Sequence, residues 1–589
     1  MNNQPTFSNK EQTRILFRLL SYLKPHKKSV FLALFLLVLT VTGDVLGPYI
    51  IKVFLDNHVA VLNFETKPIV FLAVSYFTIQ VVNVFISYFQ LVKFQEIALK
   101  IIGQLRIDVF SKIHRLGMRY FDNTPAGSIV SRATNDTEAI KDLFVSVLSA
   151  FVQAAFLIIG MYVAMFLLNP LLASFALLIL PLIILVIYIY RKYSSVVYMT
   201  MREKLSQLNA KLSESLSGMG IIQAFRQEGR FNDEFDQINE DHYGAAMNNT
   251  KLNSLLLRPV IDLIYFVAVV LLLTYFGISS FDTAIEVGVI FAFVSYINRF
   301  FEPINQMMEQ LAMFQQAIVA ASRVFALIDE EEIEPAQQQT TYEIQDGYIE
   351  FKNVTFSYDG KTPVLKNISF TVNPGETVAL VGSTGSGKSS IINLLMRFYE
   401  FEQGDILIDG HSIKSYSKRE LRKKLGLVLQ DPFLFYGTIE SNIRLYDQQL
   451  TDRDVVSAAQ FVQADQFIEQ LPDKYNQKVT ERGSTLSSGQ RQLIAFARTI
   501  ATNPKVLVLD EATASIDTET EVAIQSSLEK MRKGRTTIAI AHRLSTIQDA
   551  EQILVMHKGE IVERGNHQEL LAQKGLYHKM YLLQNGIVE

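Results

Sequence analysis

The chain contains neither cysteine nor tryptophan, and its charge shows no positive excess. The lack of cysteine excludes disulfides, thiolate metal sites and a cysteine nucleophile. Without tryptophan, an aromatic belt at a membrane surface has to consist of tyrosine and phenylalanine. The formal net charge of −4 provides no general attraction for nucleic acid, so we expect no nucleic-acid partner.

The first residues also lack the pattern of a targeting peptide. Residues 1–28 are polar and carry charges of both signs, whereas a signal peptide contains an apolar stretch and a transit peptide is poor in acids. We therefore expect residues 1–28 to form a cytoplasmic N-terminal segment.

Long apolar runs dominate the first half of the chain. The 589 residues are enough for two or three domains, and 49% of them are hydrophobic. A helix needs about 20 apolar residues to cross a bilayer. Runs of this kind occur at 29–51, 69–92, 145–168, 171–190, 259–277 and 287–308. They predict six membrane spans that lie in a lipid bilayer.

The positive charges between the spans predict their orientation. Lysine and arginine are frequent in 1–29, 93–144 and 191–258, whereas the alternate loops contain only Lys67. Because positively charged loops remain cytoplasmic, both chain ends and everything beyond the sixth span are predicted to be cytoplasmic. The chain is thus expected to be a multi-pass protein of the cell membrane.

The two long inner segments show helical periodicity, which predicts that spans two to five continue as helices into the cytoplasm. The cluster Asn123–Gly127 is expected to break one helix, and Asp136 or Thr137 to cap the next. A second tip is expected at 214–225. Each tip is either a solvated turn between helices or a docking surface for a cytoplasmic domain.

Four ionisable residues fall within or near the spans, and charge inside a membrane usually faces a cavity or a partner group. For each of these positions, a substrate contact, a structural pair and a place at the membrane boundary remain alternatives. They are Asp44, Asp262, Arg299 and Glu302.

A change of composition marks a domain boundary near residue 330. Residues 329–347 are acidic and rich in glutamine, and beyond them short β-branched runs alternate with helical stretches. We expect a membrane domain over 29–325, a linker over 326–347 and an α/β domain over 348–585.

A complete G-x-x-x-x-G-K-S loop follows the strand expected at 377–381 and precedes a helix, as a phosphate-binding loop requires. Its glycines let backbone N–H groups surround a phosphate, and the helix N-terminus adds partial positive charge. The loop and the start of its helix consist of Gly382, Ser383, Thr384, Gly385, Ser386, Gly387, Lys388, Ser389 and Ser390. Lys388 is expected to contact the β- and γ-phosphates and Ser389 to ligate Mg²⁺. The expected cofactors are therefore ATP and Mg²⁺.

A second catalytic segment, residues 506–511, is an apolar strand that ends in two acids. Asp510 is expected in the Mg²⁺ shell, and Glu511 is expected to orient or deprotonate the attacking water. An acidic strand end alone is weak support for this role, but together with the phosphate loop it predicts ATP hydrolysis.

The run Leu-Ser-Ser-Gly-Gln at 486–490, between these two motifs, is the most specific feature of the chain. With it, the chain resembles a half-transporter of the ATP-binding cassette exporters, close to the B-subfamily multidrug exporters. The resemblance covers the chain from about residue 14 onward. It implies an α-helical six-span transmembrane domain fused to an α/β P-loop nucleotide-binding domain, the type I (type IV) exporter architecture, and an ATP-driven translocase.

The resemblance also assigns roles to single residues. Tyr358 matches the aromatic residue that stacks on adenine, and Gln430 matches the glutamine that touches Mg²⁺ and the membrane domain. Glu481 matches a contact to a membrane-domain tip, and Asp517 matches the loop that crosses to the opposite subunit. His542 matches the histidine at the γ-phosphate. The two inner tips match the coupling loops of the exporters.

In this family each ATP lies between the phosphate loop of one subunit and the signature of the other, so a second half-transporter is required. The signature residues that would complete the partner's site are Ser487, Ser488, Gly489 and Gln490. Ser488 stands where the family usually has glycine, and its side chain is expected to weaken that site. Because Glu511 and His542 are intact, the chain resembles the catalytically competent subunit of a heterodimer whose partner has a normal signature and lacks the catalytic glutamate. A homodimer that tolerates the serine is the alternative.

The leading hypothesis is export of hydrophobic or amphipathic small molecules as multidrug efflux. Flipping of a lipid or lipid-linked substrate by a homodimer is the alternative, which positive residues in the cavity would favour. Peptide export with maturation usually needs a cysteine protease domain, and this chain contains no cysteine. A non-transporting ATPase is excluded by the six spans.

Overall fold

The chain forms two compact units in the computed structural model, which describes residues 8–256, 259–279, 286–338, 341–445, 447, 449–510, 518–541 and 547–585. The helical unit comprises Met1–His114 and Ala126–Glu330. The α/β unit comprises Arg115–Pro125 and Glu331–Glu589. A short segment of the first half of the sequence therefore belongs to the α/β unit.

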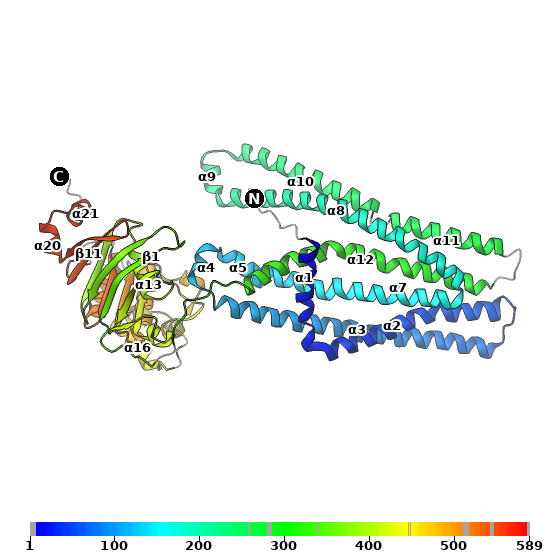
Figure 1. Ribbon diagram of the computed structural model, residues 1–589, viewed down its shortest axis with the longest axis horizontal. Coiled ribbons are helices and arrows are strands. Elements are labelled where there is room, and N and C mark those ends of the chain that lie inside the picture. Colours follow the sequence, from blue (N-terminus) through cyan, green and yellow to red (C-terminus); the bar gives the residue numbers. More distant parts are fainter. Residues whose placement is uncertain are drawn as a thin grey trace. The chain divides into compact units, whose positions relative to one another are not determined.

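Within the described residues, the helical unit contains six helices that are long and apolar enough to cross a membrane, as the sequence predicts (Figure 1). Its main helices are α1 (Asn9–Ser21), α2 (Lys27–Phe54), α3 (Thr66–Ile113), α7 (Ser149–Leu168), α8 (Pro170–Ser217), α11 (Pro259–Ser279) and α12 (Val287–Ile328). The turn between α7 and α8 is tight because Asn169 caps α8. Its side-chain oxygen accepts from the N–H groups of Leu171 at 3.1 Å and Leu172 at 3.2 Å, and Pro170 occupies the first helical position.

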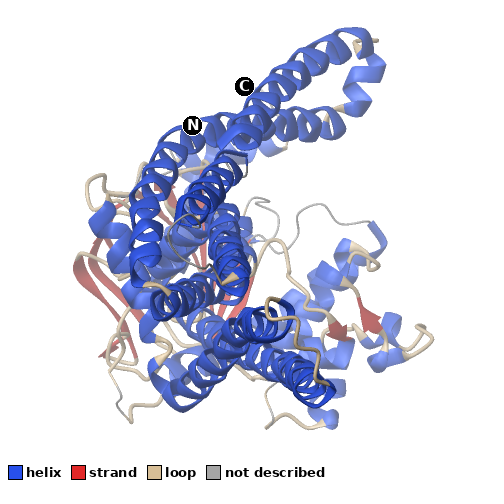
Figure 2. Cartoon of the chain, turned by 90° about the vertical axis from the view of Figure 1, so that its right-hand side faces the viewer, coloured by secondary structure: helices blue, strands red, loops and turns tan. Residues whose placement is uncertain are grey.

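Several helices extend far beyond the thickness of a bilayer. α3 and α8 have 48 residues each, about 70 Å at 1.5 Å per residue, whereas the hydrocarbon core is about 30 Å thick. The short helix α9 (Met219–Ala224) follows α8, and α10 (Glu228–Leu256) returns beside it. In Figures 1 and 2 this α8–α9–α10 hairpin diverges from the other helices of the helical unit. The predicted extension of the spans into helical hairpins is confirmed here.

The first inner segment contains the expected helix break but not the expected cap. The helix α4 (Met118–Asn123) is followed by α5 (Ala126–Ala133), α6 (Asn135–Asp142) and a π-helical turn (Leu143–Leu148) that leads into α7. Thr134 precedes α6, and its side chain makes no capping hydrogen bond. The Thr137 hydroxyl donates to the Ala133 carbonyl at 2.9 Å, and Asp136 lies 3.6 Å from Arg323. The capping prediction is wrong because α6 begins at Asn135, so Asp136 and Thr137 lie inside its first turn rather than ahead of it.

The α/β unit is built on two main sheets. The antiparallel sheet has the order β2-β1-β4-β5, and the six-stranded sheet has the order β12-β11-β3-β10-β9-β6. The antiparallel strands are β1 (Ile349–Phe356), β2 (Leu365–Val372), β4 (Gln403–Ile408) and β5 (His411–Ser412). The others are β3 (Thr377–Gly382), β6 (Leu425–Val428), β9 (Val506–Asp510), β10 (Thr536–Ile540), β11 (Gln552–His557) and β12 (Glu560–Gly565). β6, β9, β10, β3 and β11 run parallel, which explains why their sequences are nearly continuous apolar runs.

The α/β unit also contains a small strand pair formed by β7 (Gly437–Thr438) and β8 (Lys478–Val479), and several helices. The helices are α13 (Lys388–Leu395), α14 (Lys418–Lys424), α15 (Ile439–Arg444), α16 (Asp452–Phe461), α17 (Asp465–Ile468), α18 (Ser488–Ala501), α19 (Thr518–Arg532), α20 (His567–Ala572) and α21 (Leu576–Gln584).

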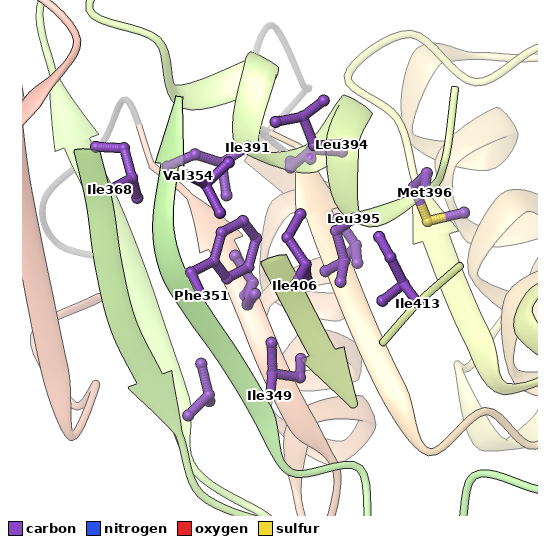
Figure 3. Packing of buried hydrophobic residues seen from close by; sticks show 14 of the residues in the cluster. Ile349, Phe351, Val354, Ile368, Ile391, Leu394, Leu395, Met396, Ile406 and Ile413 are labelled. Carbon is purple, nitrogen blue, oxygen red and sulfur yellow. The ribbon is translucent and has the colours of Figure 1, made fainter. Parts of the chain in front are cut away.

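The core of the α/β unit anchors the helix that follows the phosphate loop. Figure 3 shows Phe351 and Ile406 of the antiparallel sheet packed near Ile391 and Leu395 of α13. All four are at most 2% exposed, and burial of each such side chain contributes about 1.5–3 kcal/mol. Val378 and Leu380 of β3 belong to the same buried cluster, so residues of both sheets fix α13 behind the phosphate loop.

Candidate functional site

Several predicted site residues follow neighbouring strands of the parallel sheet. The phosphate loop begins at the end of β3, Asp510 ends β9, and Gln430 comes two residues after β6. Ile540 of β10 lies opposite both Leu380 and Asp510 in the strand register. Because the carboxyl ends of parallel strands share one edge, the loop, Asp510 and Gln430 lie along that edge.

Lys388 is held inside the phosphate loop. Its side chain is buried, and its ammonium group donates to the carbonyls of Gly382 at 2.7 Å and Ser383 at 3.0 Å. The lysine is the first residue of α13, after Gly387 in a left-handed conformation with φ of 103°. A β-carbon on Gly387 would lie 2.7 Å from Leu365 Cδ2, so both the backbone angle and the space favour glycine.

The loop has the features of a phosphate cradle. A β-carbon on Gly382 would collide with the Met556 carbonyl and approach the Ser386 hydroxyl to 2.7 Å. The Ser386 hydroxyl is buried and has no hydrogen-bond partner among the residues that the structure describes. A buried hydroxyl without a partner is costly, and a phosphate oxygen would satisfy it. Ser383, Thr384, Gly385 and Ser389 are exposed and leave the loop open to a ligand.

The oxygen groups expected around Mg²⁺ fit that ion. Ser389 and Gln430 are exposed, Asp510 is half-buried, and all three offer the oxygen ligands that Mg²⁺ prefers. Among the described residues there is no group of three or more His, Cys, Asp or Glu side chains that could hold a metal alone. Such a set suits an ion that completes its shell with water and phosphate oxygens.

Tyr358 and Ser390 contact each other. The Tyr358 hydroxyl lies 3.1 Å from the Ser390 hydroxyl and accepts from the Asn393 amide at 3.1 Å. The Tyr358 ring packs edge-on with Phe356 and Tyr399, at centroid distances of 4.7 and 4.9 Å. The phosphate-loop helix α13 thus positions the aromatic residue that was predicted to stack on adenine.

The signature residues form an ordinary helix start. Ser487 precedes α18, its hydroxyl accepts from the Gln490 N–H at 3.2 Å, and the Gln490 side chain accepts from the Ser487 N–H at 3.0 Å. This reciprocal capping box fixes the first turn. Ser488 and Gly489 are the first two residues of that turn, at the end of α18 that carries the partial positive charge of the helix. The exposed Glu481 lies in the 3₁₀ turn Glu481–Gly483 ahead of this helix.

An arginine that the sequence did not indicate connects this helix to the segment after Gln430. Arg498 donates to the carbonyls of Asn442 at 2.8 Å and Phe433 at 2.9 Å. Burial lowers the pKa of Arg498 to about 10, so the guanidinium remains charged at neutral pH. No motif marks this position, because its role depends on residues 56 and 65 positions away.

Three predicted residues, Glu511, Asp517 and His542, lie outside the described residues. Their expected roles stay predictions. The flanking strands β9 and β10 are described and adjacent, so the chain leaves both strands at the edge that carries the phosphate loop.

Residues Arg115–Pro125 of the first inner tip belong to the α/β unit. The Gly117 N–H donates to the Glu332 carbonyl at 3.0 Å, the Glu334 N–H donates to the Arg115 carbonyl at 3.1 Å, and Leu116 forms a β-bridge with Ile333. In addition, the Tyr399 hydroxyl donates to the Asp122 carboxylate of α4. The sequence marked this tip as a break but gave no sign of its pairing with residues 332–334.

The second inner tip, around Gly218, exposes apolar side chains. Leu216, Ile221 and Phe225, in and beside the short helix α9, are 70%, 67% and 73% exposed. Clustered exposed apolar residues are typical of an interaction surface.

Two of the four ionisable residues in the spans pair with each other. Arg299 of α12 lies 3.5 Å from Asp44 of α2, and the Asn83 amide of α3 donates to the same Asp44 oxygen at 3.2 Å. Gly43 permits this contact, since a β-carbon there would meet the Asn83 side chain at 2.7 Å. The structural pair that was one hypothesis from the sequence is therefore present between Asp44 and Arg299. Glu302 is exposed one turn further along α12.

Both halves of the chain match known protein families. Residues 30–304 match the model of the ABC transporter transmembrane region, and residues 365–514 match that of the ABC transporter domain. A Bacillus subtilis (strain 168) protein, named as a probable multidrug resistance ABC transporter ATP-binding/permease protein, YheH, is 49% identical over 524 residues. These are 89% of this chain and 78% of that protein.

Two further proteins are similar over most of their length. A Mycobacterium bovis protein named as a fatty acid ABC transporter ATP-binding/permease protein is 38% identical over 481 residues, which are 82% of this chain and 76% of that protein. The solved structure of a bacterial Atm1-family ABC exporter with ATP bound is 28% identical, with a TM-score of 0.79, and the match covers 95% of this chain and 98% of that one.

Proposed function

The chain belongs to the ABC transporters, and on this premise we propose that it exports hydrophobic and amphipathic small molecules across the cell membrane as one half of a heterodimer. It is an ATP-hydrolysing transporter subunit, with a multi-pass membrane domain and a cytoplasmic nucleotide-binding domain. The substrate class, the partner and the roles of single residues are the proposed part.

We assign the nucleotide contacts as follows. The phosphate loop and Lys388 bind the β- and γ-phosphates, and Tyr358 stacks on adenine. Ser389, Asp510 and Gln430 supply oxygens to Mg²⁺, which would offset the phosphate charge. The buried, unpartnered Ser386 hydroxyl is the single observation that best supports a phosphate in this loop.

Glu511 and His542 act at the reacting phosphate in this proposal. Glu511 orients and deprotonates the water that attacks the γ-phosphate, and His542 contacts the γ-phosphate oxygens. The N–H groups at the start of the opposite subunit's signature helix face the same phosphate, since a helix N-terminus favours negative charge. ATP binding thus draws the two nucleotide-binding domains together, and hydrolysis releases them.

The two inner tips transmit this closure to the spans. α4 already forms part of the α/β unit, and the apolar surface of Leu216, Ile221 and Phe225 offers a second contact for a cytoplasmic domain. Closure moves these tips and opens the spans to the outside, and release returns them.

The charges of α12 favour neutral or cationic amphiphiles over anionic lipids. Both arginines of α12 lie near carboxylates, Arg299 at 3.5 Å from Asp44 and Arg323 at 3.6 Å from Asp136. The exposed Glu302 adds negative charge. Charge inside a bilayer is costly, so we expect the side of α12 that carries Arg299 and Glu302 to line a water-filled cavity. The multidrug name of one relative agrees with this substrate class, whereas the fatty-acid name of another supports lipid transport as the second candidate.

Transport assays in proteoliposomes can decide between these substrates. ATP-dependent movement of a cationic dye such as ethidium, and not of a fluorescent anionic phospholipid, is expected. Movement of the phospholipid alone would replace the proposal by the lipid alternative. The Glu511→Gln variant serves as the control without hydrolysis.

Ser488, together with the intact Glu511, supports the heterodimer. In such an assembly the working site uses this chain's phosphate loop, and the weak site uses its signature. ATP turnover should be measured for the chain alone and with a candidate partner. Turnover by the lone chain at the rate of the pair would contradict the heterodimer.

A further inference from the structure

Tyr399 connects the predicted adenine platform with helix α4. The residue lies between α13 and β4, is only 6% exposed, and belongs to an aromatic cluster of Phe356, Tyr358 and Tyr399. Its ring is perpendicular to that of Tyr358, with an interplanar angle of 89° and 4.9 Å between centroids. Its hydroxyl donates to the Asp122 carboxylate in α4.

The other contacts of the cluster make it stiff. Phe356 packs against Tyr358 at 4.7 Å and against Tyr399 at 5.8 Å, so each ring touches both others. The Tyr358 hydroxyl is held by Ser390 and Asn393 of α13. A displacement of the Tyr358 ring therefore has to displace Tyr399, because close-packed interiors transmit small shifts.

The last contact of this series joins a phenol to a carboxylate, Tyr399 to Asp122. Burial, and then the hydrogen bond to Asp122, raise the pKa of the Tyr399 phenol above its ordinary value, so it stays a donor at neutral pH. Asp122 itself is exposed. Hydrogen bonds to charged acceptors are stronger than neutral ones, which makes this bond a firm attachment for α4.

We propose that Tyr399 is a positioning residue through which adenine binding at Tyr358 shifts helix α4 of the first inner tip. A base stacked on Tyr358 has to share that ring with Tyr399, and the Tyr399 hydroxyl transfers the shift to Asp122. Base recognition then reaches the membrane domain by a route separate from the phosphate contacts of Lys388. The inference rests on the proposed role of Tyr358.

The absence of cysteine allows a direct test, because one introduced cysteine is the only labelling site of the chain. Met118 of α4 is 40% exposed and suits a nitroxide label as Met118→Cys. The full chain is assembled in nanodiscs with its partner, whose cysteines are replaced, and Glu511→Gln prevents hydrolysis. Label mobility is recorded with saturating MgATP and with magnesium tripolyphosphate, which has no base.

ATP is expected to change the label's mobility, and tripolyphosphate to change it at least about threefold less. Tyr399→Phe keeps the ring but loses the hydroxyl, and it should reduce the ATP response to the tripolyphosphate level while the ATP affinity changes less than about twofold. Asp122→Ala should have the same effect, and the double variant no larger one, because both remove one interaction. Asp122→Asn, which keeps an acceptor oxygen, should restore most of the response.

Tyr416→Phe is the matched control. Tyr416 is also fully buried in the α/β unit and donates to the Ile408 carbonyl at 2.6 Å. An unchanged ATP response in Tyr399→Phe would overturn the proposal, as would an equal loss in Tyr416→Phe. A full response to tripolyphosphate would also overturn it. Separately, an unchanged ATP affinity in Tyr358→Ala would show that the assigned adenine platform is wrong.

Discussion

The two half-sites that this chain contributes differ in how strictly the fold determines their residues. In the phosphate-loop half, Gly387 has a left-handed backbone, Gly382 has no room for a side chain, and Lys388 is buried among carbonyls. In the signature half, Ser487 to Gln490 form a regular helix start with a capping box. The phosphate loop therefore cannot change without loss of its shape, whereas Ser488 can replace glycine without backbone strain. A substitution at Ser488 acts on the ligand rather than on the fold.

The largest effect is expected at the predicted base of the phosphate-loop half. Glu511→Gln keeps the size of the side chain but removes the proton acceptor, and general-base catalysis contributes about 10²–10⁴-fold to a rate. ATP turnover should fall by this factor while ATP binding stays intact. Both quantities are measured on the assembled transporter. Turnover above about one tenth of the original rate would remove Glu511 from this role.

The next effect is expected for Gly387→Ala. A side chain at φ of 103° costs about 1–3 kcal/mol, and its β-carbon would overlap Leu365. ATP affinity, measured by titration, should fall about tenfold or more, which corresponds to 1.4 kcal/mol.

Gly534→Ala is the control for this change. Gly534 also has a positive φ, of 73°, but its β-carbon would meet no atom within 4 Å. This variant should lower the melting temperature and leave ATP affinity unchanged. Equal losses of ATP affinity in both variants would mean that the phosphate loop is no more constrained than an ordinary turn.

A smaller effect is expected at the cap of the signature helix. Ser487→Ala removes the acceptor of the Gln490 N–H, and loss of an N-cap costs about 0.5–2 kcal/mol. The free energy of unfolding of the nucleotide-binding domain, followed by denaturant titration of the transporter, should fall by this amount. Thr451→Ala at the similar capping box of α16 is the comparison, since it stabilises a helix outside the site. If only Ser487→Ala lowers ATP turnover, the hydroxyl also serves the ligand.

The elements of the phosphate-loop half and the membrane spans were predictable because local sequence determines them, whereas helix α18 of the signature half was not predicted. The spacing of the phosphate loop and the apolar run before Asp510 predicted β3, α13 and β9, and the six apolar runs predicted the spans. The contacts that join distant residues were not predictable. Tyr399 and Asp122 are 277 positions apart, and Asp44 of α2 pairs with Arg299 of α12 and accepts from Asn83 of α3. Neither pair leaves a local pattern, because each depends on the packing of separately formed elements.

The smallest expected effect, Ser488→Gly, decides between the two assemblies. Glycine at this position lets the helix start approach the phosphate of the partner's nucleotide more closely. A helix-start position loses at most about 0.5 kcal/mol from the lower helix propensity of glycine relative to serine, so folding should be unaffected.

In a heterodimer, the site completed by Ser488 lacks a catalytic glutamate. ATP turnover should then change by less than about twofold, while ATP dissociates more slowly from that site. In a homodimer every site contains both Ser488 and Glu511, and turnover should rise about threefold or more, equivalent to about 0.65 kcal/mol. Turnover and the dissociation rate of a fluorescent ATP analogue, measured on the same preparation, distinguish the two. No change in either quantity would mean that Ser488 does not weaken the signature half at all, and the contrast with the phosphate loop would then be confined to the backbone.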